Sequence, residues 1–319
     1  MFNRPAFGLG VFLLLALLPL LAQLLGYPFY VKIGTRIIIW SIAALSLGLV
    51  LNWGGMVSLV HAAFMGVAAY VVGLLAWHAT NSQPITLAGV TIGGSTSALV
   101  VWPLAIAAAG FAAFVIGGLS LRTTGLYFIM ITLAFGQMLY YFTVALQKYG
   151  GDDGTAVVRS LLPWGINLAN PLHLYYLAFA LLIVAYAIVV RIVRSPFGMV
   201  IQAARQNDRR AKAVGFSTYR YKLACFTVSG VLGGIAGILF VNAEAYISPA
   251  ALHWTRSAEL VIMVLLGGMG TLIGPIIGAA SFIILEVVLS SWTNYWQAIL
   301  GPVLILIVLF GKRGQAARD

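Results

Sequence analysis

The chain alternates long apolar runs with short polar segments along its whole length. About 20 predominantly apolar residues suffice for a helix to cross a membrane, and each of seven runs predicts such a helix. The runs with almost no charge are Gly8–Gly26, Ile37–Leu51, Met56–Trp77, Leu99–Leu119, Leu126–Leu146, Leu172–Val190 and Leu223–Ala243. We expect the first run to be retained as a helix, because it is long for the apolar core of a signal peptide and lacks a convincing small-x-small cleavage site.

The last part of the chain has a less regular pattern. The apolar stretch Leu260–Ile273 is interrupted by Gly274 and Pro275 before Ile276–Trp292, and Tyr295–Phe310 is short. We expect three further helices here, some of them broken or tilted, as transporters often have beside their pathway. The pattern as a whole predicts an all-α polytopic transmembrane bundle of about ten spans.

Composition supports a membrane protein. Hydrophobic residues make up 62% of the chain and charged residues 8%, with a mean hydropathy of +1.02. A soluble domain has about 25% charged residues, so a water-soluble fold is excluded. The single cysteine, Cys225, excludes an intrachain disulfide and a cysteine-rich metal site.

The net charge of +11 comes from 18 Lys and Arg residues that fall almost entirely between the apolar runs. This distribution indicates membrane topology, not nucleic-acid binding. With the N-terminus in the cytoplasm, thirteen of these residues lie inside and five outside, which favours N-in and C-in. Lys32 and Arg36 are the outer cations that fit this topology least well. We expect a bacterial or archaeal cytoplasmic (inner) membrane location.

No polar segment is long enough for a soluble domain, so residues 1–319 are expected to form one transmembrane domain with a cytoplasmic segment at 195–215. Ser58–Val67 and Glu259–Gly268 share Leu-Val at their second and third places and Gly at their ninth. The two stretches would run in opposite directions across the membrane. They therefore hint at an inverted repeat.

The segment from residue 191 to 222 carries eight basic residues and one acid, Asp208. Ser195 and Pro196 predict the start of a short helix, and Gly215 predicts its end. An amphipathic basic helix of this kind can lie on anionic lipid. It can equally insert into a groove on a cytoplasmic partner and transmit movement to the membrane helices. Composition leaves both interpretations open.

Five stretches, in this order, resemble the permeases of branched-chain amino acid importers, the LivM-like family. They are Ser58–Gly66, Gly125–Phe128, Gly150–Gly154, the cytoplasmic stretch Arg205–Gly215 and Gly267–Pro275. The resemblance covers most of the chain. One departure is Val60, which stands where the family has a glycine before His61.

The resemblance implies an ATP-binding-cassette (ABC) importer. Such an importer has two permeases, two cytoplasmic ATPases and an external solute-binding protein. This chain would be one permease, embedded in the membrane and without a cofactor of its own, and the second permease would be a LivH-like paralogue. The chain has no G-x-x-x-x-G-K-[ST] motif, so ATP would be used by the partners. The residues expected to couple to the ATPase are Ala204, Arg205, Asn207, Asp208, Arg209, Ala211, Ala213 and Gly215.

A second set of candidates lies in or beside the apolar runs, where a polar group is costly unless it faces protein, water or a substrate path. The candidate pathway residues are Asn52, His61, Thr132, Gln137, Gly274, Pro275 and Glu286. Each polar one can instead bridge helices. Glu286 could be structural, or it could meet a substrate ammonium in a lumen.

The sequence predicts neither a metal site nor catalytic residues, because its histidines lack metal-ligand spacing and Asp152 and Asp153 are adjacent in a glycine-rich loop. A membrane enzyme is therefore the third choice. Within the importer family, urea or short amides are alternative substrates. An ion-gradient-driven secondary transporter is the alternative from another class, although it would need buried ionisable relays and only Glu286 clearly interrupts an apolar run.

Overall fold

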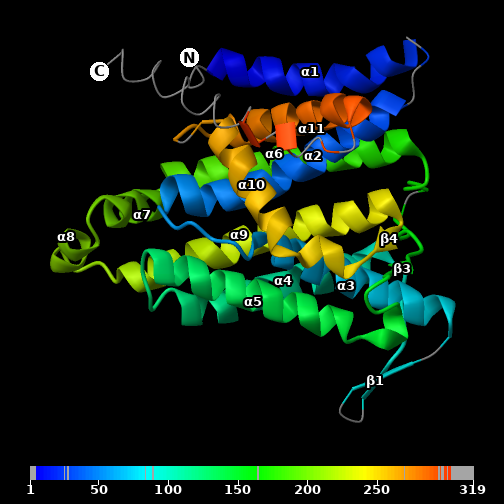
Figure 1. Cartoon of the computed structure of the whole chain (residues 1–319), viewed down its shortest axis with the longest axis horizontal. Helices are drawn as coiled ribbons and strands as arrows, with labels where there is room; N and C mark the ends of the chain where they lie inside the picture. Colours follow the sequence, from blue (N-terminus) through cyan, green and yellow to red (C-terminus); the bar gives the residue numbers. More distant parts are fainter. Residues whose placement is uncertain are drawn as a thin grey trace.

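The computed structural model is an all-α polytopic bundle, and it describes residues 5–24, 26, 29–82, 84–87, 90–163, 165–268, 270–293, 295, 298–299 and 301–302. The α-helices are α1 (Pro5–Leu24), α2 (Phe29–Gly48), α3 (His61–Thr80), α4 (Ala98–Ser120), α5 (Leu126–Val144), α6 (Pro171–Arg194), α7 (Pro196–Gln206), α8 (Asp208–Ala213), α9 (Thr218–Glu244), α10 (Trp254–Leu266) and α11 (Gly274–Trp292). Figure 1 shows the long helices packed side by side. The predicted fold class is confirmed.

Among the described residues, seven helices are long and apolar enough to cross a membrane: α2 with its π-helical end, α3, α4, α5, α6, α9 and α11. The expected count of about ten is therefore not reproduced. The predicted helix over Leu260–Ile273 is wrong in its bounds, because α10 runs from Trp254 to Leu266 and has 13 residues. Most of the predicted last span, Tyr295–Phe310, lies outside the described residues.

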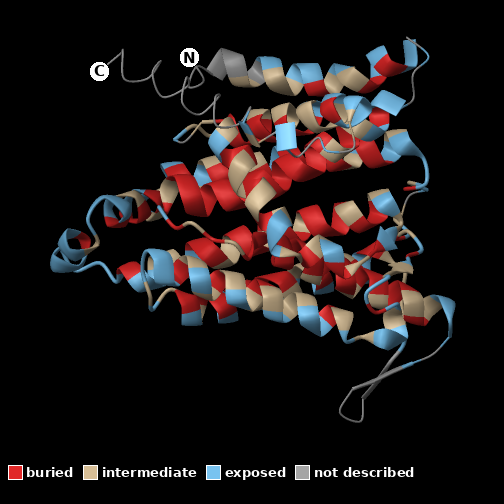
Figure 2. Cartoon of the chain, in the orientation of Figure 1, coloured by how far each residue is buried: buried red, intermediate tan, exposed pale blue. Residues whose placement is uncertain are grey.

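Three helices form the inside of the bundle. The apolar windows of α2, α3 and α9 are 89%, 72% and 67% buried, whereas those of α4, α5 and α6 are 33%, 22% and 28% buried. Figure 2 shows the buried residues concentrated along the central helices, with exposed positions on the outer ones. The outer helices expose large apolar side chains, which is the arrangement expected of a surface solvated by lipid.

The two ends of the bundle differ. At one end, the short helices α7 and α8 project from the body (Figure 1). The opposite end carries the antiparallel pairs β1 (Ile85–Leu87) with β2 (Val90–Ile92) and β3 (Thr155–Ala156) with β4 (Tyr246–Ile247). The α7–α8 end is the predicted cytoplasmic side, and we refer to the other as the outer end. The N-in topology stays a prediction, as does the inverted repeat.

Helices α3 and α10 begin next to each other inside the molecule. Helix α2 continues into the π-helix η1 (Leu49–Trp53), and a non-helical segment then leads to α3, while α10 follows the short 3-10 helix η3 (Pro249–Leu252). The backbone N–H of Ala62 in the first turn of α3 donates to Ser257 Oγ in the first turn of α10, at 3.1 Å. Each residue is 1% exposed. The free N–H group of one helix start is thus satisfied by the other helix.

The predicted break at Gly274 and Pro275 is the start of α11 and not the middle of a helix. Pro275 occupies the first turn of α11, where its missing N–H costs no helical hydrogen bond. Both residues are buried, and a Cβ built on Gly48 of α2 would lie 2.8 Å from Pro275 Cγ. The glycine in α2 therefore allows the close approach of α11.

Candidate functional site

The predicted cytoplasmic segment, residues 195–215, is made of two short helices, α7 and α8, where the sequence predicted one. Ser195 caps α7, with its Oγ accepting from the Gly198 N–H at 3.3 Å. At Asn207 the backbone is extended, with φ −155° and ψ 99°, and this ends α7. The Asn207 side chain then accepts from the Arg210 N–H at 2.9 Å and so begins α8. The predicted cap at Ser195 is confirmed.

Gly215 ends α8 with φ +99°, a conformation that favours glycine. The N–H of Gly215 donates to the Lys212 carbonyl at 2.9 Å, and the N–H of Phe216 donates to the Ala211 carbonyl at 3.2 Å. These two bonds form a Schellman motif. The predicted C-terminal cap at Gly215 is confirmed, and the motif turns the chain back toward α9.

Asp208 connects α8 to the membrane helix α9. Its carboxylate forms ion pairs with Lys212 of α8 at 2.7 Å and with Lys222 of α9 at 2.8 Å. Partial burial alone would raise the pKa of Asp208, but the hydrogen bonds from Lys212 and Lys222 lower this pKa to about 2. The carboxylate therefore stays ionised at physiological pH, and a displacement of α8 would pull directly on the first turns of α9.

The apolar face of this segment packs against the chain itself, contrary to expectation. Ala204 is 3% exposed and Ala211 is 7% exposed. Arg205 is exposed, but its guanidinium donates to the Asn52 carbonyl and its side chain packs over Gly55. The sequence placed Ala204 and Ala211 on an apolar face and Arg205 on the polar one, but it could not decide whether the apolar face met the chain or a partner.

A different set of residues in this segment is open to a partner. Of the predicted coupling residues, Arg205, Asn207, Arg209, Ala213 and Gly215 are exposed, and Asp208 is partly buried. Two apolar side chains stand beside them. Val214, which helical spacing places on the apolar face with Ala204 and Ala211, is instead 72% exposed, and Phe216, which the sequence analysis missed, is 41% exposed. Their signal in the sequence is an apolar residue on either side of the capping glycine, where a solvated turn would carry polar residues.

His61 lies inside the bundle and links α2, α3 and α9. Its Nε2 is 2.7 Å from Ser229 Oγ, and this hydroxyl donates to the Ser46 carbonyl at 2.5 Å. Because the Ser229 hydrogen is used by Ser46, His61 Nε2 must be the donor of its own bond. Nδ1 is then the acceptor, with Ser58 Oγ at 3.2 Å. Both ring nitrogens of His61, which is 1% exposed, are therefore occupied.

Among the described residues, the side chain of His61 makes no hydrogen bond to any of the other candidate pathway residues. Thr132 is buried in α5, where its Oγ1 accepts from the Leu59 N–H at 3.3 Å. Gln137 is half-buried in the same helix. Asn52 lies in η1 and is 1% exposed, and neither atom of its amide group has a partner among the described residues.

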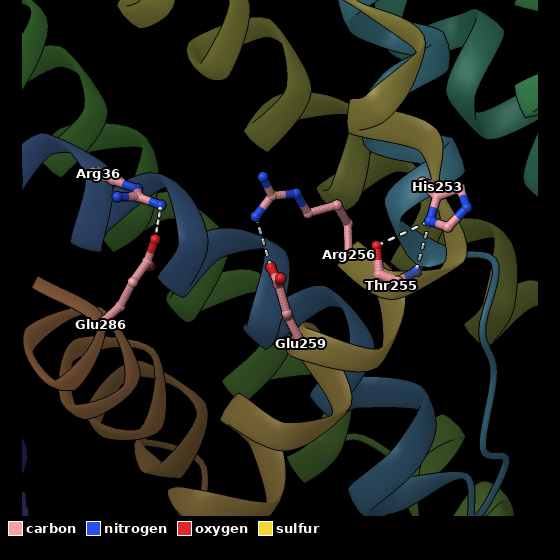
Figure 3. A network of polar contacts seen from close by, with 6 residues as sticks. All are labelled: Arg36, His253, Thr255, Arg256, Glu259 and Glu286. Atoms are coloured by element: carbon pink, nitrogen blue, oxygen red, sulfur yellow. Dashed lines mark hydrogen bonds and ion pairs between the residues drawn. The ribbon is translucent and has the colours of Figure 1, made fainter. Parts of the chain in front are cut away.

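Glu286 of α11 pairs with Arg36 of α2, with 2.7 Å between Glu286 Oε1 and Arg36 Nη2. Figure 3 shows this ion pair beside a second one, between Arg256 and Glu259 of α10 at 2.9 Å. The fold therefore compensates the charge of Glu286 inside the apolar run, because it pairs this carboxylate with Arg36. The place of Lys32 and Arg36 in the predicted topology stays untested.

Among the described residues, no group of three or more His, Cys, Asp or Glu side chains is placed to hold a metal ion. Long apolar helices around a buried polar centre, with a charged segment projecting from one end, define a polytopic membrane protein. The comparisons with known proteins narrow this class. The family model described as "branched-chain amino acid transport system / permease component" matches residues 29–309. The chain belongs to this family, and the resemblance seen in the sequence is confirmed.

Individual relatives agree. The chain is 25% identical to the high-affinity branched-chain amino acid transport system permease protein LivM of Escherichia coli, over 94% of this chain and 74% of the relative. A probable LivM of Methanocaldococcus jannaschii is 29% identical over 42% of this chain and 41% of the relative. The autoinducer 2 import system permease protein LsrC of Photorhabdus laumondii is 30% identical over 47% and 48%. No solved structure matches. The family is that of ABC importer permeases, and it implies ATPase and binding-protein partners.

Proposed function

We propose that this chain is the membrane-spanning subunit of an ABC importer that moves branched-chain amino acids delivered by a solute-binding protein. The observation that carries the proposal is the family match over residues 29–309, supported by the LivM similarity over most of the chain. Residues 1–319 act as one permease domain. The partners are a LivH-like second permease, two cytoplasmic ATPases and the binding protein, in a cytoplasmic (inner) membrane.

The α7–α8 segment is the contact with the ATPase in this proposal. Its exposed surface carries Arg209, Ala213, Val214 and Phe216, and Asp208 ties it to α9. Two adjacent apolar side chains exposed to water are better explained by a protein partner than by a solvated turn. Ala204 and Ala211, which are buried, support this surface from behind, and Arg205 lies beside it.

A pair of variants separates ATPase docking from adhesion to lipid. Val214→Asp places a charge on the proposed contact and leaves every basic residue in place. Arg210→Gln combined with Arg220→Gln, two exposed basic residues outside the proposed contact, removes about 2 kcal/mol of attraction to anionic lipid. Docking predicts that Val214→Asp abolishes ATPase co-purification and ATP-dependent leucine uptake in vesicles, with a milder effect of the double variant. Val158→Asp is the matched control for ATPase co-purification, because Val158 is 51% exposed and follows β3, far along the chain from the α7–α8 segment.

The opposite result would leave the segment as a lipid anchor: full ATPase association in Val214→Asp beside a strong defect in the double variant. Uptake by this chain without ATPases would favour a secondary transporter. Wild-type import of urea or a short amide in place of leucine would change the substrate and keep the importer.

A further inference from the structure

A cavity of about 430 Å³ lies at the outer end of the bundle. It is enclosed by the first turns of α2, the start of α6, the last turns of α9 and the segment that follows β3. These parts meet at the end opposite α7 and α8 (Figure 1). The volume is within the range of about 300–1,000 Å³ that is usual for small-molecule sites.

The cavity contains charges of both signs that the protein does not neutralise. Arg36 is held by Glu286, but Lys32 and Glu244 have no ion-pair or hydrogen-bond partner among the described residues. Arg159 donates only its Nε, to the Asn242 carbonyl at 3.0 Å, so within the described chain its two terminal nitrogens are unpaired. The cavity thus offers two sources of positive charge and one carboxylate.

An apolar wall adjoins these charges. Trp40 lines the cavity, is 4% exposed and has an indole Nε1 without a partner among the described residues. Its ring is packed against the Arg256 guanidinium, 5.9 Å from the ring centroid. Phe240 and Leu174 complete the wall. A small ligand with an aliphatic side chain would cover this surface.

We propose that the cavity binds the zwitterion of an aliphatic α-amino acid. The α-carboxylate pairs with Arg159 and Lys32, the α-ammonium pairs with Glu244, and the side chain lies against Trp40 and Phe240. A charge-assisted hydrogen bond at each end of the ligand fixes its orientation. The carboxylate of Glu244 disfavours a simple anion at the same place.

This inference rests on the proposed function and deepens it, because it places a substrate subsite inside one permease near the outer surface. A zwitterionic lipid headgroup has the same pair of charges. We favour an amino acid over the lipid headgroup, because the apolar wall at Trp40 lies beside the charges and would hold a short aliphatic side chain.

The test measures ligand binding by saturation-transfer NMR on the complete transporter in nanodiscs. Three probes differ by one group each: L-leucine, isocaproate, which lacks the ammonium, and isopentylamine, which lacks the carboxylate. Wild type should bind leucine more tightly than either analogue. Glu244→Gln should weaken leucine binding about tenfold, so that leucine no longer binds more tightly than isocaproate. In Arg159→Gln, leucine should no longer bind more tightly than isopentylamine.

Controls separate the site from general damage. Asp152→Asn changes another exposed outer carboxylate and should leave all three affinities unchanged. Glu244→Asp should recover part of the discrimination. Unchanged leucine affinity in Glu244→Gln would overturn the site, as would equal binding of leucine and isocaproate by wild type. Loss of leucine binding in phosphatidylethanolamine nanodiscs alone would assign the cavity to lipid and also overturn it.

A separate measurement decides the proposed function. ATP-dependent leucine uptake by the wild-type transporter with its binding protein shows whether the importer carries branched-chain amino acids. If wild type takes up leucine and Glu244→Gln has unaltered leucine uptake and binding, the proposed binding site is refuted and the proposed function stands. Absence of uptake in wild type would refute the proposed substrate.

Discussion

Helices α3 and α9 approach so closely that one added methyl group should force them apart. A Cβ built on Gly237 of α9 would lie 1.9 Å from the Met65 carbonyl oxygen of α3. One turn earlier on α9, a Cβ on Gly233 would lie 3.5 Å from its nearest neighbour, Ser46 Oγ, which is an ordinary contact. Gly237→Ala and Gly233→Ala therefore make the same change on the same helix in two different environments.

The two substitutions should change the free energy of unfolding in opposite directions. An alanine in a helix is favoured over glycine by about 0.8–1 kcal/mol, so Gly233→Ala should leave the free energy of unfolding unchanged or raise it slightly. At Gly237 the neighbour is a backbone carbonyl that cannot rotate away. Overpacking in a dense interior costs about 1–3 kcal/mol, and here it exceeds the helix gain. We expect Gly237→Ala to be less stable than Gly233→Ala by about 2 kcal/mol.

The assay is thermal unfolding of the purified transporter in one detergent, followed by size-exclusion recovery after heating. Gly237→Ala should unfold several degrees below wild type, and Gly233→Ala at or above it. Equal midpoints for Gly233→Ala and Gly237→Ala would refute the claimed contact between α3 and α9. If Gly237→Ala lost uptake but kept full stability, Gly237 would be required for transport and not for helix packing.

Two further predictions concern charge. Glu286→Gln should lower stability by about 1.5 kcal/mol, the lower end for a hydrogen bond to a charged group, because the partner Arg36 side chain is 37% exposed. A double-mutant cycle with Arg36→Met measures the coupling, and additive effects of the two substitutions would argue against the pair. In a Cys225→Ser background, Asp152→Cys should react with a membrane-impermeant thiol reagent from outside and Gln206→Cys only from inside. The reverse pattern would overturn the topology.

Much of the local structure could be predicted from the sequence. The apolar runs predicted the spanning helices, since a run of this length has no other stable arrangement in lipid. Ser195, Pro196 and Gly215 predicted the limits of the cytoplasmic segment, because capping depends on neighbouring residues only. Asn207 could have predicted the break between α7 and α8, because an asparagine side chain often caps the start of a helix.

The sequence itself determined a lipid-embedded helical chain with one strongly charged segment between two apolar runs, and only the tertiary structure decided which helices form its centre. Helix α6 has a mean hydropathy of 2.5 over its apolar window and is 28% buried, whereas the window of α2 and η1 has 1.8 and is 89% buried. Lipid tails and protein interior are equally apolar, so hydropathy cannot tell the two environments apart. The pairing of Arg36 with Glu286 joins residues 250 positions apart and depends on the packing of α2 against α11. Likewise, only the fold shows that Ala204 faces inward and Val214 outward, because both lie on an amphipathic segment whose partner the sequence does not contain.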